Sequence, residues 1–267
     1  MNRIDLSFQR LKKEGKKAFI PYITAGDPGI ETTKKFVRVL AGAGADIIEL
    51  GIPFSDPLAD GPTIQRAVER SLSAGATTRG IFRMVRDLRK DVDVPLVFMT
   101  YYNIVFNYGI EKFIADSKKS GADGIIVPDL PMEESHELTD IADKHDFSVI
   151  LLAAPTTPVD RFGKIARCSR SFIYYVSITG VTGARKALSD KLYGHIRHLK
   201  RVTDKPICVG FGVSTPGQAR EVARAADGVI VGSAIINVLE KSLKNKKKMV
   251  RDVEAFGRSI ARAVHSV

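Results

Sequence analysis

The sequence predicts a (β/α)8 barrel with extra helices, folded as a single domain over residues 1–267. Short apolar runs alternate with amphipathic segments along the whole chain, which is the pattern of parallel strands joined by helices. Eight such units can be counted, and eight parallel strands can close into a barrel without a free edge. An open doubly wound sheet usually has fewer strands and a glycine-rich turn after the first one, and this turn is missing here. The predicted architecture is therefore the TIM barrel.

The first half of the chain carries four of these units and two additional helices. Ile4, Phe8 and Leu11 form one apolar stripe, which predicts a leading helix. Gly42 ends the helix after the first strand, because glycine favours helix C-termini. A loop is expected at residues 101–103, after the third strand. The strands are predicted at 18–23, 46–50, 95–100 and 124–128, and the helices at 3–13, 30–43, 63–74, 78–90, 110–120 and 133–144.

The second half carries the other four units and a final helix. Pro155 ends the fifth strand, since proline cannot donate to a strand ladder. A long glycine-bearing loop is predicted at residues 177–189, and Gly232 and Ser233 open the eighth helix. The strands are predicted at 148–153, 172–176, 206–210 and 228–231, and the other helices at 159–166, 190–201, 215–225 and 247–264.

The composition favours a soluble cytoplasmic protein. The 41 Lys and Arg residues against 30 Asp and Glu give a net charge of +11, for which nucleic-acid binding is one interpretation. We favour a solvated basic surface that steers an anionic metabolite, because the charge is spread along predicted helix faces. The two cysteines have no metal-ligand spacing, so neither a disulfide framework nor a metal site is predicted. No apolar run approaches the roughly 20 residues that a membrane helix needs.

One carboxylate stands inside an otherwise apolar strand. The two-residue period of a strand places Glu49 on the same face as Ile47, whereas Ile48 and Leu50 lie on the other face. If Glu49 points into the barrel, apolar surroundings raise its pKa and prepare it to donate a proton. The alternative is a Glu that pairs with a Lys or Arg across the barrel.

Three more acids lie on loops that follow strands, where barrel enzymes carry catalytic groups. Asp60 follows the second strand, and we expect Glu49 and Asp60 to form an acid/base pair over a small substrate. Asp56 precedes Pro57 and is more typical of a turn. Asp129 ends the fourth strand, where it either forms a turn or holds the loop after the second strand by hydrogen bonding.

Glycine-bearing segments follow the last three strands. Glycines let an anion approach backbone N–H groups, and a helix that begins at Gly232 and Ser233 adds the positive end of its dipole. Turns and helix caps are the alternative, but the loops after the last two barrel strands commonly bind phosphate. We therefore predict a phosphate site. The segments are 182–184, 210–214 and 232–234.

Aromatic side chains also gather at predicted strand ends. Each of them alone is more often part of a core than a ligand contact. Together they can line an apolar slot for a flat ring. They are Tyr22, Tyr101, Tyr174 and Phe211, with Ile64 and Leu58 nearby in the sequence.

Five motifs, in the same order along the chain, resemble signatures of the tryptophan synthase alpha chain family. They are TAGDP at 24–28, LGIPFSDPLADGP at 50–62, GVTG at 180–183, GFG at 210–212 and GSA at 232–234. The long acidic motif is the most specific of them, because families that share only the barrel and the phosphate loops lack it. The resemblance implies a carbon–carbon lyase that splits indole-3-glycerol phosphate into indole and glyceraldehyde 3-phosphate.

The resemblance also implies roles for individual residues. Glu49 corresponds to the acid/base residue of the family, and Asp60 to the carboxylate that accepts the indole N–H and stabilises positive charge on the ring. No metal ligands are implied. The implied substrate-binding residues are Tyr22, Ile64, Tyr101, Tyr174 and Phe211 for the indole slot, Gly183, Gly212, Gly232 and Ser233 for the phosphate, Thr182 on the loop at 177–189, and Asp129.

A partner is implied as well. Members of the family pair with a beta chain, in an α2β2 heterotetramer, and indole passes to that chain through a tunnel. The loop after the second strand is expected to face the partner. Pyridoxal phosphate is expected only in the beta chain, and no cofactor is expected in this one.

Three other functions stay open from the sequence. A different phosphate-binding barrel enzyme would act on another sugar phosphate and would not require Asp60. A non-catalytic subunit that only activates a partner would keep every function after Glu49→Gln. Nucleic-acid binding, the third interpretation, predicts strongly salt-dependent retention of DNA or RNA.

Overall fold

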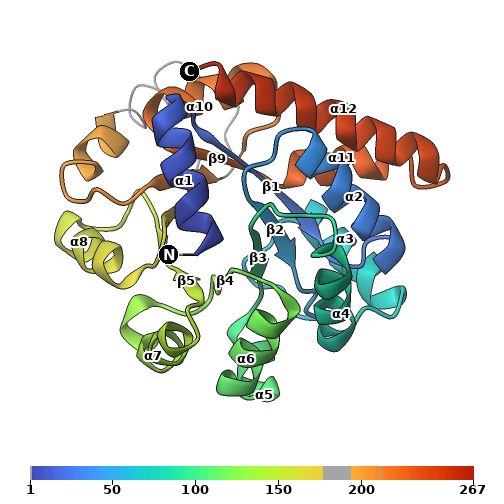
Figure 1. The fold of residues 1–267 in the computed structure, drawn as a ribbon, viewed down its shortest axis with the longest axis horizontal. Helices are drawn as coiled ribbons and strands as arrows, with labels where there is room; N and C mark the ends of the chain where they lie inside the picture. The colour runs from blue at the N-terminus through green and yellow to red at the C-terminus, as the bar shows by residue number, and fades with distance from the viewer. Residues whose placement is uncertain (1, 177–193, 211) are drawn as a thin grey trace.

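The computed structural model describes residues 2–176, 194–210 and 212–267. Its parallel strands form one nine-stranded sheet in the order β5-β4-β3-β2-β1-β9-β8-β7-β6. The two strands at the ends of this order, β5 and β6, are consecutive in the chain, and only Leu151 separates them. The sheet is therefore a nearly closed barrel with helices around it, which confirms the predicted fold (Figure 1).

The strands agree with the predicted ones to within a few residues, with one split. The predicted strand at 148–153 is divided into β5 and β6, because the amide of Leu151 donates to Oγ of Ser169 at 2.9 Å instead of to a neighbouring strand. The strands are β1 (Ala18–Thr24), β2 (Ile48–Gly51), β3 (Leu96–Met99), β4 (Gly124–Ile126), β5 (Ser148–Ile150), β6 (Leu152–Ala153), β7 (Ile173–Val176), β8 (Ile207–Gly210) and β9 (Gly228–Val231).

The helices also follow the prediction, and residues 194–199 of the predicted helix at 190–201 are helical. The predicted helix at 133–144 is divided into a short 3-10 helix, η1 (Met132–Glu134), and α7 (His136–Lys144). No helix in the described part of the chain is long and apolar enough to cross a membrane. The other helices are α1 (Arg3–Glu14), α2 (Ile30–Gly42), α3 (Pro62–Ser73), α4 (Thr78–Leu88), α5 (Tyr102–Tyr108), α6 (Ile110–Ser120), α8 (Val159–Cys168), α10 (Pro216–Ala225), α11 (Ser233–Glu240) and α12 (Lys246–His265).

The loop predicted at residues 101–103 is wrong, because Tyr102 begins α5. The backbone N–H of Tyr102 donates to the carboxylate of Asp129 at 2.9 Å, which satisfies one of the free amides at the start of this helix. Asp129 follows β4, 27 residues further along the chain. A cap from such a distance leaves no signal in the local sequence pattern.

The core has an outer and an inner layer. Ile48 and Leu50 belong to the outer layer, between the strands and the surrounding helices. Ile47 belongs to the inner layer, which fills the barrel. Ile4 and Leu11 of α1 join this inner layer, so that the leading helix closes the end of the barrel at which the strands begin (Figure 1).

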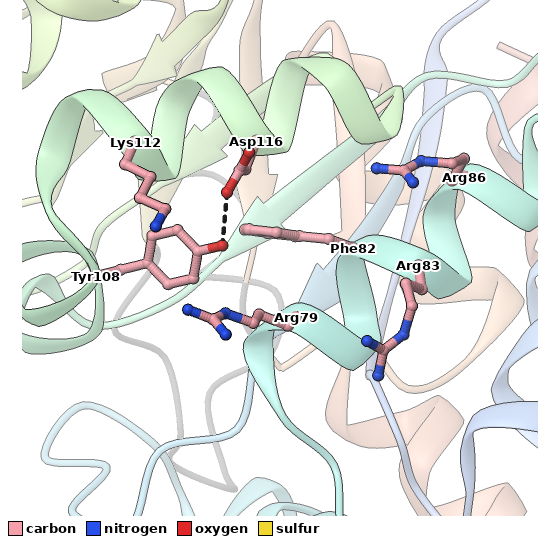
Figure 2. A pocket seen from close by; sticks show the side chains of 7 residues that line it. All are labelled: Arg79, Phe82, Arg83, Arg86, Tyr108, Lys112 and Asp116. Carbon is pink, nitrogen blue, oxygen red and sulfur yellow. Dashed lines mark hydrogen bonds between the residues drawn. The ribbon is translucent and has the colours of Figure 1, made fainter.

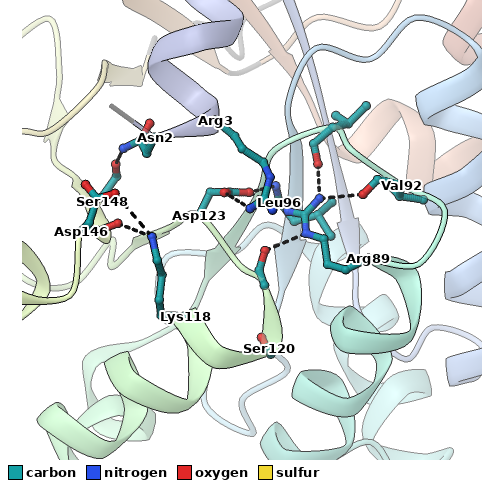
Figure 3. A network of polar contacts seen from close by, with 12 residues as sticks. Asn2, Arg3, Arg89, Val92, Leu96, Lys118, Ser120, Asp123, Asp146 and Ser148 are labelled. Atoms are coloured by element: carbon teal, nitrogen blue, oxygen red, sulfur yellow. Dashed lines mark hydrogen bonds and ion pairs between the residues drawn. The ribbon is translucent and has the colours of Figure 1, made fainter.

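A network of polar contacts ties together the N-terminal ends of the strands (Figure 3). The carboxylate of Asp123, which is buried just before β4, accepts from Arg3 at 2.9 Å and from Arg89 at 2.6 Å. It also accepts the backbone N–H of Leu96 at 2.9 Å. Through these bonds one side chain holds α1, the segment after α4, and the start of β3.

We expect Asp123→Asn to lower the free energy of unfolding by about 3 kcal/mol, because it leaves the largely buried guanidinium of Arg89 without its carboxylate. Urea unfolding followed by circular dichroism measures this change. Asp91→Asn is the matched control, because the Arg38–Asp91 pair is exposed on both sides. It should cost at most about 1 kcal/mol. Equal losses in the two variants would contradict the anchoring role of Asp123.

Candidate active site

Glu49 lies inside the barrel, at the end where the strands finish. It pairs in register with Tyr22 of β1 and with Val97 of β3. The two-residue period of β2 predicts this inward orientation, since its neighbours Ile48 and Leu50 belong to the outer layer of the core. Glu49 has 0% exposed surface, and neither of its carboxylate oxygens has a hydrogen-bond partner among the residues that the structure describes.

An unpartnered carboxylate in an apolar interior is stable only in its neutral form. Burial accordingly raises the pKa of Glu49 to about 8. The alternative of a Lys or Arg paired with Glu49 is absent from the described part of the chain, because no ion pair involves this carboxylate there. Glu49 is therefore protonated at neutral pH and is able to donate that proton.

Tyr22 and Tyr174 lie close to Glu49 within the same end of the barrel. Burial raises the pKa of both hydroxyls, and the nearby Glu49 carboxylate adds to the rise. Each ring packs directly on a glycine of a neighbouring strand. A Cβ added to Gly51 would lie 2.2 Å from Oη of Tyr22, and one added to Gly210 would lie 2.6 Å from Oη of Tyr174. Glycine is thus required where these rings cross the strands.

Asp60 lies on the loop between β2 and α3, and Tyr101 connects this loop to the end of β3. The Tyr101 hydroxyl accepts the backbone N–H of Ala59 at 2.9 Å and donates to the Asp60 carboxylate. The rings of Phe54 and Tyr101 pack with their centroids 5.4 Å apart. Burial raises the pKa of Asp60, and the hydrogen bond from Tyr101 opposes the rise.

A small pocket opens between this loop and the ends of the strands. Tyr22, Asp60 and Tyr101, three of the residues predicted from the sequence, all line it. Ile64 packs against Tyr22 in an apolar cluster next to the pocket. Glu49 does not line the pocket, because neighbouring side chains cover it completely. The full set of lining residues is Tyr22, Ile52, Phe54, Asp60, Val68, Met99, Thr100, Tyr101 and Pro128.

Several of these residues, notably Phe54 and Thr100, were not predicted from the sequence. Phe54 is part of the acidic loop motif. Its position before two acids of this motif was the available signal that it lines the pocket. The hydroxyl of Thr100 is buried without a hydrogen-bond partner in the described residues. A polar residue at the end of an apolar strand was the available signal for Thr100.

The predicted phosphate site is described only in part. Gly232 precedes α11, and no side chain caps the first amides of this helix. Ser233 is the exposed first residue of α11, and Gly212 is exposed after β8, the strand next to β9. Free amides at a helix N-terminus attract anions. Thr182, Gly183 and Phe211 lie outside the described residues, as does the loop at 177–189.

Of the two alternatives predicted for Asp129, the structure shows the turn, which includes residues 128 and 129 after β4. Its side chain is exposed, and both carboxylate oxygens accept the backbone N–H of Tyr102, at 2.9 and 3.2 Å. The hydrogen bond predicted to the loop after β2 is not present among the described residues. Asp129 instead holds the start of α5, next to Tyr101, because this helix has no side-chain cap closer in the sequence.

Comparison with known proteins identifies this arrangement. The family model described as tryptophan synthase alpha chain matches residues 8–265. The tryptophan synthase alpha chain of Caldanaerobacter subterraneus subsp. tengcongensis is 49% identical over 256 residues, which cover 96% of this chain and 97% of that protein.

The chain belongs to the tryptophan synthase alpha chain family.

Solved structures of tryptophan synthases agree with this assignment. The crystal structure of tryptophan synthase subunit alpha from Legionella pneumophila has a TM-score of 0.93 and 39% identity, with 100% of both chains covered. A chain of the tryptophan synthase complex from Pyrococcus furiosus has a TM-score of 0.82 and 36% identity over 92% of this chain and 98% of that one. Tryptophan synthase alpha chains cleave indole-3-glycerol phosphate to indole and glyceraldehyde 3-phosphate. The protein is therefore a carbon–carbon lyase of tryptophan biosynthesis.

Proposed function

We propose that Glu49 is the general acid and base of the lyase reaction and that Asp60 binds the indole ring. The observation that carries this proposal is the buried, unpartnered Glu49 carboxyl group with a pKa of about 8, beside a pocket that holds a second carboxylate. A catalytic acid needs a pKa near the working pH, and burial supplies it here.

The proposed reaction uses the two acids in sequence. Glu49 first gives its proton to C3 of the indole ring, and Asp60 accepts the ring N–H and stabilises the positive charge that develops on the ring. The Glu49 carboxylate then takes the proton of the hydroxyl on the adjacent side-chain carbon. The O–H electrons form the aldehyde, the carbon–carbon bond breaks, and its electrons restore the aromatic ring. Glu49 ends the cycle protonated, as it began.

The remaining predicted residues would hold the two ends of the substrate. Tyr22, Ile64 and Tyr101 surround or back the pocket and suit a flat apolar ring. Tyr174 lies near Glu49 and Tyr22. The free amides at Gly232 and Ser233, with Gly212 beside them, would bind the phosphate through the backbone. Phe211, Thr182 and Gly183 complete the set as expected from the motifs, and Asp129 would act indirectly through α5.

We propose a beta chain as the partner, in an α2β2 complex that receives indole through a tunnel and alone carries pyridoxal phosphate. Large apolar side chains are exposed at the catalytic end: Leu58 is 93%, Phe106 64% and Val159 40% exposed. They lie on the loop after β2, on α5 and at the start of α8, and exposed apolar side chains at these places would suit contact with a protein partner. The Pyrococcus furiosus relative comes from a tryptophan synthase complex. We place this assembly in the cytoplasm.

The test is an assay of indole formation from indole-3-glycerol phosphate by the purified chain, with and without a beta chain. Indole release that is accelerated by the beta chain supports both the reaction and the partner. Cleavage of a different sugar phosphate, or no indole under either condition, would overturn the proposal.

The pH dependence follows from the pKa of Glu49. Because the free enzyme must start with Glu49 protonated, we expect kcat/KM to fall as the pH rises through about 8. The raised pKa of Asp60 adds a fall at the acidic side, where this carboxylate becomes neutral. A pH series of initial rates measures both limbs. A rate that increases between neutral pH and the alkaline side would show that Glu49 reacts first as a base.

A further inference from the structure

A second cavity lies on the outside of the barrel, between α4 and the α5–α6 segment (Figure 2). Its volume is about 500 Å³. α4 packs against α2 and α6, whereas α11, which carries the proposed phosphate site, packs against α3 and α12. The proposed lyase mechanism therefore makes no use of this cavity. The residues that line it are Arg79, Phe82, Arg83, Arg86, Tyr108, Lys112 and Asp116.

Three of the four basic residues come from one face of α4. Arg79, Arg83 and Arg86 follow at intervals of four and three residues, so their side chains leave the helix on the same side. They extend over about 10 Å of helix length. The opposite face of α4 carries the buried apolar residues of this helix. Lys112 of α6 adds the fourth cation from across the cavity.

These cations are poorly neutralised, although other arginines of the protein have carboxylate partners. Arg38, Arg66 and Arg161 each form an ion pair with an acid. None of the four cations of the cavity forms an ion pair within the described residues. Arg79 interacts with the Tyr108 hydroxyl instead. Lys112 lies 5.8 Å from the centre of the Tyr108 ring.

The single carboxylate of the lining is already engaged. Oδ2 of Asp116 accepts the Tyr108 hydroxyl at 2.7 Å, and this bond fixes the tyrosine in the wall of the cavity. Arg83 and Arg86 are exposed and free to bind. The cavity thus combines a shaped wall with unpaired guanidinium groups, whose planar forks match phosphate oxygens.

We propose that this cleft binds a small polyanion that carries two or more phosphate groups. Several phosphates are needed to contact cations spread along α4 and a further one on α6. A concave site of this size favours a small molecule over a flat contact with a larger polyanion. The site also gives a specific role to four of the cations that contribute to the +11 net charge.

Isothermal titration calorimetry with inorganic tripolyphosphate tests the proposal on the full chain. The buffer contains about 150 mM sodium chloride to screen weak surface attraction, and excess glyceraldehyde 3-phosphate to occupy the substrate site. We expect one site per chain with a Kd below about 1 mM. Arg83→Gln combined with Arg86→Gln should weaken binding by roughly tenfold or more. Indole release should be unchanged in this variant, which shows that it is folded.

Lys244→Gln combined with Lys247→Gln is the matched control, because it removes the same two positive charges from a distant exposed segment. Its affinity should stay within about twofold of the wild type. Equal weakening in both double variants would mean that net charge alone attracts the anion and would overturn the site. The absence of measurable binding to the wild type, or binding of long nucleic acids but not of tripolyphosphate, would overturn it too.

Discussion

Glu49→Gln is expected to fold normally and to lose indole release by about 10³-fold or more. Gln has the shape of protonated Glu and fits the same apolar position, but it can neither donate the proton to C3 nor take one from the hydroxyl. Substrate binding should change little, because the substitution leaves the shape of the site unchanged and adds no charge. Single-turnover kinetics with saturating substrate separates the chemical step from binding.

The same substitution should make the protein more stable at alkaline pH. Glu49 has a folded-state pKa of about 8 against an ordinary value of 4.5, so the folded chain binds more protons than the unfolded chain between these values. The stability of the wild type therefore decreases as the pH rises through this interval. Glu49→Gln removes this dependence on pH. At pH 8 the free energy of unfolding of the variant should therefore exceed that of the wild type by on the order of a few kcal/mol. Below pH 4.5 the two proteins should be equally stable.

Asp56→Asn is the control for both measurements. Asp56 is an exposed acid on the neighbouring loop, and its carboxylate accepts only the hydroxyl of the adjacent Ser55 among the described residues. We expect its indole release and its stability to equal those of the wild type. A Glu49→Gln enzyme with near-normal turnover would contradict the proposed role of Glu49 as the general acid and base.

Asp60→Asn is expected to lower kcat by about 10²- to 10³-fold, with a smaller change in KM. The neutral amide can still contact the ring N–H, but it cannot stabilise the positive charge that appears on the ring during protonation. The effect therefore falls on the transition state more than on the bound substrate. Steady-state rates of indole formation give kcat and KM separately.

Tyr101→Phe helps to interpret that result. It removes the hydroxyl that joins Ala59 and Asp60 but keeps the Asp60 charge and the aromatic ring. We expect a loss of roughly tenfold, because the carboxylate is less well positioned. If Tyr101→Phe were as damaging as Asp60→Asn, the role of Asp60 would be to hold the loop and not to stabilise charge.

The sequence predicted those parts of the fold that depend on local periodicity. The inward position of Glu49 follows from the alternation with Ile48 and Leu50, and the apolar stripe of α1 follows from Ile4 and Leu11. It did not predict α5, whose start is held by Asp129 from a different loop. The interruption of the fifth strand depends in the same way on Ser169, a distant partner of Leu151.

In the candidate site, too, local features could be predicted from the sequence, whereas features that depend on distant partners could not. Residues within the motifs, such as Asp60 and Gly232, are recognisable from the sequence because their chemistry and their place after a strand agree. Met99 and Thr100 line the pocket only because β3 stops beside the loop after β2. Neither the covered state of Glu49 nor the hydrogen bond from Tyr101 to the loop could be read from spacing, since both depend on side-chain packing between elements.

One end of the barrel stabilises the fold, and the other end carries the proposed reacting groups. This separation determines which residues can be substituted without unfolding the protein. The polar anchor at Asp123 and the plug formed by α1 stabilise the end at which the strands begin. The proposed reacting groups lie at the other end of the barrel, where the strands finish. Laboratory evolution of substrate range can therefore randomise the pocket residues heavily while the variants remain expressible. Libraries with no substitutions at the end where the strands begin should contain far fewer unfolded variants than libraries with substitutions along the whole chain.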